Sequence, residues 1–88
     1  MEQTIFQTIS FQLRNYHMYN EYINEVVLEE EKPQELHINV ITSLEKEQRR
    51  DFGIELDKIK QFYKKKENYE IVFHQYSQDM WTNYLTKK

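Results

Sequence analysis

Residues 43–66 read SLEKEQRRDFGIELDKIKQFYKKK, and the way they fold decides how many strands the protein has. One interpretation is a single long helix with its apolar residues on one stripe: Leu44, Phe52, Leu56, Ile59 and Tyr63. The other is a hairpin turn at 45–48, an alternating strand at 52–56 and a short helix over 57–66. Ile54 favours the strand, because in a helix it would point away from the stripe. Gly53 weakens both structures, so both interpretations stay open, and the topology below uses the strand.

The sequence before this segment predicts a strand followed by a helix. Residues 4–14 alternate, with Ile9, Phe11 and Leu13 on one side, which is typical of a half-buried strand. From Asn15 onward the spacing becomes helical, and one arc collects these residues: Tyr16, Tyr19, Ile23, Val26 and Val27. Pro33 is expected to end that helix, because proline disfavours the helical conformation in the residue before it.

The remaining segments predict two more strands and a last helix. Residues 35–42 alternate between apolar and polar, and residues 69–74 do the same. Ser77 is placed to cap a short C-terminal helix, whose apolar side holds Met80, Trp81, Tyr84 and Leu85. The alternation also indicates a sheet with helices on one face only, since strands buried on both faces read as continuous apolar runs.

This order of elements predicts one α+β domain over residues 1–88. The first six elements match a small ferredoxin-like (split βαβ) sheet with helices mainly on one face, and a short C-terminal helix follows. A small three-stranded α/β unit is the first alternative. A mostly antiparallel β meander with a C-terminal helix, in which residues 16–30 are strand, is the other, because tyrosine, valine and isoleucine favour strands.

The composition excludes several classes of chemistry. The 88 residues include no cysteine and a single glycine, which rules out disulfides, thiolate sites and glycine-rich phosphate-binding loops. The mean hydropathy is −0.94, so no stretch suits a membrane span, and we expect a cytoplasmic protein. Alanine is absent, while tyrosine, asparagine and lysine are abundant, which indicates an AT-rich genome such as that of a low-GC bacterium, its phage or another mobile element.

No residue pattern predicts an enzyme, a cofactor or a bound metal. None of the three serines lies in a context typical of a nucleophile. His37 and His74 fall on the polar side of two predicted strands, and they would approach each other if those strands were neighbours. A small ligand- or metal-binding domain around these two histidines is therefore one alternative function.

The first functional hypothesis is a regulatory module that binds another protein. Acidic residues gather at Glu25, Glu29, Glu30 and Glu31, and such a patch steers association with a basic partner. The aromatic residues exceed what a small core needs, and aromatic side chains are enriched at interfaces. The aromatic residues expected to be exposed are Tyr22, Tyr76 and Trp81. Self-association into a homodimer is the simplest form of this hypothesis.

The second hypothesis is a nucleic-acid-binding module. Basic residues that could contact phosphates accompany Phe62 and Tyr63: Arg49, Arg50, Lys58, Lys60, Lys64, Lys65 and Lys66. The net charge is −3 and the sequence pI is about 5.6, whereas nucleic-acid-binding domains tend to be strongly basic. The sequence therefore favours a protein partner over nucleic acid.

Overall fold

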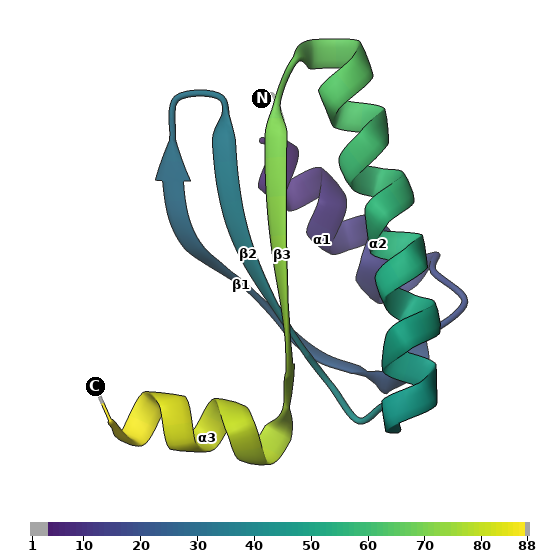
Figure 1. The fold of residues 1–88 in the computed structure, drawn as a ribbon, viewed down its shortest axis with the longest axis vertical. Helices are drawn as coiled ribbons and strands as arrows, with labels where there is room; N and C mark the ends of the chain where they lie inside the picture. The colour runs from purple at the N-terminus through teal and green to yellow at the C-terminus, as the bar shows by residue number, and fades with distance from the viewer. Residues whose placement is uncertain (1–3, 88) are drawn as a thin grey trace.

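Helices and strands of the computed structural model, which describes residues 4–87, form an α+β fold (Figure 1). The elements are α1 (Ile5–Asn15), β1 (Ile23–Lys32), β2 (Glu35–Thr42), α2 (Lys46–Glu67), β3 (Glu70–Ser77) and α3 (Gln78–Thr86), with a 3-10 turn at Asn20–Tyr22. The strands lie in the order β1-β2-β3; β1 is antiparallel to β2, and β2 is parallel to β3. The predicted α+β class is confirmed, but the described residues form three strands instead of the four of a ferredoxin-like sheet.

The first element is a helix, so the strand predicted over residues 4–14 is wrong. Thr4 and Gln7 form a capping box: the Gln7 N–H donates to the Thr4 hydroxyl at 3.1 Å, and the Thr4 N–H donates to the Gln7 side chain at 3.0 Å. This pair satisfies N–H groups that a helix start leaves free. Ile9 and Leu13, one turn apart, enter the core, whereas Phe11 points away and is 50% exposed.

The second element is a strand, so the helix predicted from Asn15 onward is also wrong. Ile23 pairs with Thr42 and Glu25 with Ile41, which means that β1 holds one extra residue there. Such a bulge shifts the side-chain alternation by one position. Ile23 and Val26, three residues apart, therefore face the same side, and their spacing imitates that of a helix. A second bulge follows Leu28.

A tight hairpin joins β1 to β2 where the sequence was expected to end a helix. Lys32 pairs with Glu35, so the loop is Pro33-Gln34. Gln34 has a φ of 61°, and proline followed by a residue of positive φ is the arrangement of a type II turn. Pro33 therefore reverses the chain between two strands.

Residues 46–67 form one long helix, which decides between the two interpretations of the central segment. Glu45 and Gln48 make a capping box at its start, and Asn68 ends it in the left-handed conformation with a φ of 52°. Ile54 is exposed on the outer surface, so the strand that it favoured is not formed. Gly53 provides space: a Cβ there would lie 3.3 Å from the Gln75 side-chain nitrogen, which donates to the Arg49 carbonyl at 3.1 Å.

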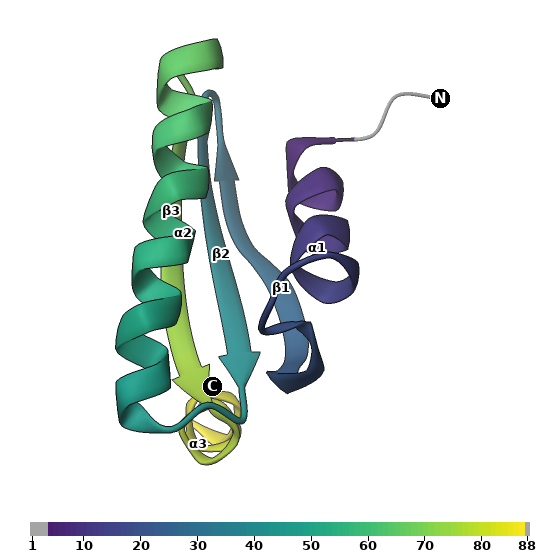
Figure 2. The ribbon, with the colours of Figure 1, turned by 90° about the vertical axis from the view of Figure 1, so that its right-hand side faces the viewer.

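The core lies between the sheet and the two longer helices. One face of the sheet contributes Leu36, Ile38, Val40 and Ile71, with Val26 from β1. Against it pack two residues of α1 and four of α2: Ile9, Leu13, Phe52, Leu56, Ile59 and Tyr63. α2 runs along β3 (Figure 1), and α1 lies next to β1 (Figure 2). The prediction that helices lie mainly on one face is therefore confirmed.

α3 lies at the end of the sheet opposite the β1–β2 hairpin (Figure 1). The Ser77 hydroxyl caps it by accepting from the Met80 N–H at 3.2 Å, which confirms the predicted start of this helix. Through its contacts with Tyr76 it packs on the sheet face that α1 and α2 leave uncovered. Among the described residues, no helix combines the length and the apolar character that crossing a membrane requires.

Candidate functional site

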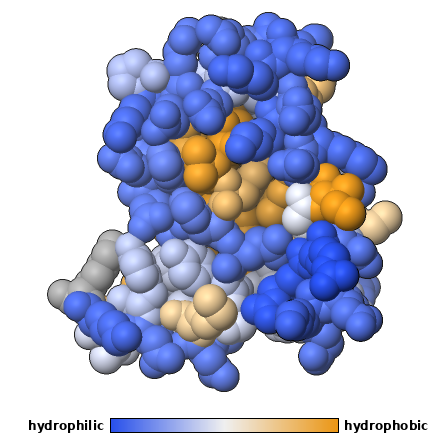
Figure 3. All heavy atoms as spheres, in the orientation of Figure 1, coloured by the Kyte–Doolittle hydropathy of each residue, from blue (hydrophilic) through white to orange (hydrophobic). Residues whose placement is uncertain are grey.

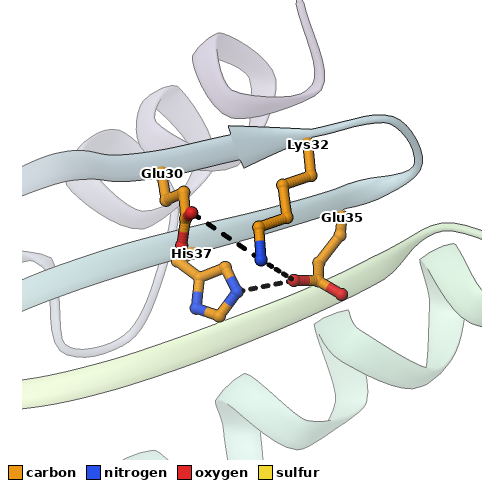
Figure 4. Close-up of polar contacts among 4 residues, drawn as sticks. All are labelled: Glu30, Lys32, Glu35 and His37. Carbon is orange, nitrogen blue, oxygen red and sulfur yellow. Dashed lines mark hydrogen bonds and ion pairs between the residues drawn. The ribbon is translucent and has the colours of Figure 1, made fainter.

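The face of the sheet away from α1 and α2 carries a cluster of polar side chains near the hairpin (Figure 4). The His37 Nε2 lies 2.8 Å from the Glu35 Oε2, and the Lys32 ammonium lies 3.9 Å from the same oxygen and 3.7 Å from Glu30. The hydrogen bond with His37 is the main cause that lowers the pKa of Glu35, and the charge of Lys32 adds to it. These are solvent-accessible pairs, which contribute little to stability.

The predicted approach of the two histidines is found. The His37 and His74 rings stack with their centroids 5.9 Å apart and an angle of 16° between their planes. They meet because β2 and β3 are parallel neighbours and Asn39 pairs with His74, two residues beyond His37. In residues 4–87 no group of three or more histidine, aspartate or glutamate side chains converges as a metal site would need.

Two of the three aromatic residues expected at an interface pack inside the protein. The Trp81 ring lies 5.4 Å from Tyr76 and 5.4 Å from Tyr84, and only 6% of Trp81 is exposed. Tyr76 itself is partly buried beneath α3. Trp81 therefore attaches α3 to the sheet and is not an exposed binding residue. Tyr22, in the 3-10 turn, is exposed as expected.

The acidic residues of β1 do not form one patch. Glu29 accepts a hydrogen bond from the Tyr84 hydroxyl at 2.5 Å, so it helps to hold α3. Glu30 pairs with His37 on the polar face and contacts Lys32, whereas Glu31 pairs with Leu36 toward the helices. Glu25 is exposed further along the strand. The second bulge, after Leu28, leaves Glu29 and Glu30 on the face that α3 covers, and alternation then turns Glu31 toward the helices.

The basic residues surround α2 instead of sharing one side. Arg49 and Arg50 lie near its start, and five lysines lie in its second half: Lys58, Lys60, Lys64, Lys65 and Lys66. At 100° per residue, Lys60 and Lys64 fall on the side toward β3, while Lys58 and Lys65 point outward. Lys66 lies on the α1 side, with its ammonium 5.7 Å from the Phe62 ring centroid.

The outer surface of the two helices exposes large apolar side chains that the sequence interpretation missed. Phe62 on α2 is 53% exposed, and Phe11 on α1 contacts the exposed Tyr16 with ring centroids 5.4 Å apart. Met18 and Ile54 are exposed as well. Phe11 and Tyr16 had been assigned to the apolar sides of a strand and a helix that the chain does not form. Recognising the Thr4–Gln7 capping box would have placed Phe11 on the outside.

A groove of about 250 Å³ lies between these two helices. Gln12 of α1 forms one wall, and α2 supplies Lys58, Ile59, Phe62 and Tyr63. Ile59 and Tyr63 are buried in its floor, whereas Phe62 and Lys58 stand at its rim. We define the outer helical surface as this groove with Phe62 and Lys58 at its rim.

A smaller hollow of about 150 Å³ lies between α2 and β3. Its apolar walls are Leu56, Val72 and Phe73, and Asp57 and Lys60 flank it. Figure 3 shows apolar atoms in this region, over β3 and toward α2, inside a hydrophilic surround.

Comparison of the chain with models of protein families, with curated proteins and with solved structures finds no match. The function is therefore argued from the surfaces described above.

Proposed function

We propose that this chain is a non-enzymatic module that binds another protein through its outer helical surface. The exposure of Phe62 at the rim of the α1–α2 groove is the observation that carries the proposal. Exposed apolar surface with a polar rim is typical of interaction sites on proteins. The acidic residues of β1, which the sequence favoured for this role, are divided among α3, the polar face and the helical side, and so support it less.

Aromatic side chains at the rim of a groove suit this role energetically. Residues of this kind dominate binding energy when a partner buries them. Phe62 exposes about half of its surface while Tyr63, its neighbour in sequence, fills the floor of the groove. A partner that covers Phe62 would therefore extend the existing core without displacing any side chain already in it.

The experiment compares two matched serine variants in affinity capture followed by quantitative mass spectrometry. Phe62→Ser removes the proposed anchor, and Leu85→Ser removes a side chain of similar exposure, 53% against 52%, from the distant α3. We expect wild type and Leu85→Ser to recover the same partner from a lysate of the cells that encode the chain, and Phe62→Ser to lose at least tenfold of it. Circular dichroism checks that both variants are folded. The proposal is wrong if no captured protein depends on Phe62, or if Leu85→Ser has the same effect.

A nucleic-acid-binding module is the second candidate, and one contact favours it. Lys66 lies above the exposed Phe62 ring, and a base could stack on that ring while nearby lysines contact phosphates. Electrostatic binding is strongest at low salt. A gel-shift assay with single-stranded DNA and RNA at low salt tests this candidate, and it fails if neither is shifted. Charge reversal at Glu30 and Glu31, which leaves the hydrogen bond between Glu29 and Tyr84 in place, should strengthen such binding.

A further inference from the structure

We propose that the partner inserts an acidic amphipathic helix into the α1–α2 groove. This inference rests on the proposed function and names the chemistry of its partner. It follows from the walls of the groove, from the charges around it and from the backbone of the elements that form it.

The groove walls are helices, and this limits the form of the partner. Helices use their backbone N–H and C=O groups internally, apart from the first and last turns. Ile59 lies in the middle of α2, and Gln12, in the last turn of α1, has its carbonyl bonded to the Tyr16 N–H at 2.9 Å, so neither offers a free backbone group to an extended strand. A partner that buries its backbone here must satisfy its own hydrogen bonds, and an α-helix does so. Helix-in-groove recognition is an established mode of this kind.

The charges at the groove favour an acidic partner. Lys58 stands at its rim, and Lys66 and the outward-pointing Lys65 lie further along the same helix. Two carboxylates lie near them: Glu55 pairs with Lys58 at 2.9 Å, and the charge of Glu67 acts on Tyr63 in the floor. Three cations against two carboxylates leave this rim positive, although the whole chain carries a net charge of −3. Acidic residues flanking the apolar stripe of a bound helix would meet these lysines, which favours the correct partner and speeds its association.

The groove suits a helix better than nucleic acid or a second copy of this chain. Its floor is Ile59 and Tyr63, whereas Lys60 and Lys64 lie on the other side of α2 and cannot join a phosphate track here. The acidic run of this chain lies in a strand, β1, and so cannot supply the helix. Both alternatives are outcomes of the test below.

The test selects binders from a displayed library of helical peptides. An apolar stripe at i, i+3, i+4 and i+7 is kept, and the flanking positions are randomised among Glu, Lys, Gln and Ser. Clones are counted only if they bind the wild-type chain and lose binding to Phe62→Ser. We expect the surviving clones to be enriched in glutamate and depleted in lysine. Enrichment of lysine, no charge preference, or no Phe62-dependent clone would each overturn the inference.

Two matched double variants then locate the contact, with the strongest selected peptide as the probe. Lys58→Glu with Lys66→Glu reverses the charge at the groove and should weaken binding at least tenfold. Lys60→Glu with Lys64→Glu makes the same change in charge on the β3 side of the same helix and should change affinity less than twofold. Affinity of the wild type should also fall as salt rises, because the partner's carboxylates are screened. Equal effects of the two double variants would contradict the proposed site.

The outcomes separate this inference from the function beneath it. If affinity capture finds a Phe62-dependent partner but the library yields no acidic helices, the partner chemistry is wrong and the interaction function stands. If single-stranded nucleic acid displaces the selected peptide, or sedimentation shows self-association that Phe62→Ser abolishes, the groove binds that occupant instead. If nothing depends on Phe62 in either experiment, both proposals fail.

Discussion

Asn39 is a buried polar residue that lowers the stability of the sheet around it. It lies in the central strand with 1% of its surface exposed, and neither atom of its amide has a hydrogen-bond partner within residues 4–87. A buried polar group without a partner costs about 1–3 kcal/mol. Its neighbours across the sheet are Val27 and His74, and valine, which is close to asparagine in size, favours a strand.

We therefore predict that Asn39→Val stabilises the protein by about 1 kcal/mol in urea unfolding. The matched control is Thr42→Val on the same strand, which is equally buried but whose hydroxyl accepts from the Leu44 N–H at 3.4 Å. That variant should be less stable than wild type, because an existing hydrogen bond is lost. If Asn39→Val also loses stability, water satisfies the amide in solution and the explanation is wrong.

Individual residues also show what the sequence could reveal of the candidate site. Alternation placed His37 and His74 on the polar sides of two strands, and the structure stacks them. Phe11 was missed because the spacing of Ile9 and Leu13, four residues apart, fits one face of a strand and also one turn of helix, and only in the helix does Phe11 point away from them. Trp81 was misjudged because exposure depends on which surface the last helix covers, and no local pattern encodes that choice.

At the scale of the element, the sequence contained the helix starts but not the bulges. Thr4-x-x-Gln7 is a capping box that its sequence pattern could have identified, whereas Glu45-x-x-Gln48 begins with a residue that is not a usual N-cap. The bulges of β1 depend on its pairing with β2, since the extra residue is defined only against a partner strand. The spacing within β1 therefore predicted a helix, because the bulges that produce this spacing can be identified only from the pairing with β2.

The capping box of α1 gives a prediction at this scale. We expect Thr4→Ala to reduce the free energy of unfolding by about 1 kcal/mol, because it leaves the Gln7 N–H without its acceptor. Thr8→Ala, one turn later, should be neutral or slightly stabilising, since alanine favours a helix interior. Urea unfolding of both variants decides the matter. Equal losses would mean that packing, and not the capping box, holds the start of α1.

At the scale of the whole molecule, the two sheet faces are closed in different ways. α1 and α2 cover one face with a continuous apolar core. On the other face, α3 packs through Trp81 and Tyr84 near the end of β3, and Glu35, His37 and Lys32 lie near the hairpin. The class of fold could be predicted because alternating strands need only one apolar layer. The order of helices and strands could not be predicted, since the apolar spacing of a segment can fit both a helix and a strand.

The stability of the whole fold should fall in acid, and groups on both faces contribute. His17 packs against Phe52 with ring centroids 5.4 Å apart, and its Nδ1 accepts from the Tyr19 N–H at 3.2 Å. Burial lowers the pKa of His17 below its ordinary 6.5, and the charge of Glu55 opposes this only in part. The unfolded chain therefore binds a proton more readily than the folded one. The free energy of unfolding should therefore decline once the pH falls below about 6.5, and it should go on declining down to the lower pKa of His17 in the folded protein.

Glu35 acts in a more acidic window. Its folded pKa lies below the ordinary 4.5 because His37 and Lys32 stabilise the carboxylate. That contribution is present above pH 4.5 and is lost as the pH falls through the folded value. Because the Glu35 contribution is lost only below pH 4.5, a loss of stability between pH 6.5 and pH 4.5 can be assigned to a histidine.

We predict that His17→Phe removes the decline in stability just below pH 6.5. Phenylalanine keeps the ring contact with Phe52 but cannot take up a proton. His74→Phe on the opposite face is the matched control, and it should keep the decline because His17 remains. The measurement is urea unfolding at several pH values, and the quantity compared is the slope of the unfolding free energy against pH, not its absolute value. If the slope survives in His17→Phe, or disappears in His74→Phe, the decline does not come from the contact between α2 and the loop after α1.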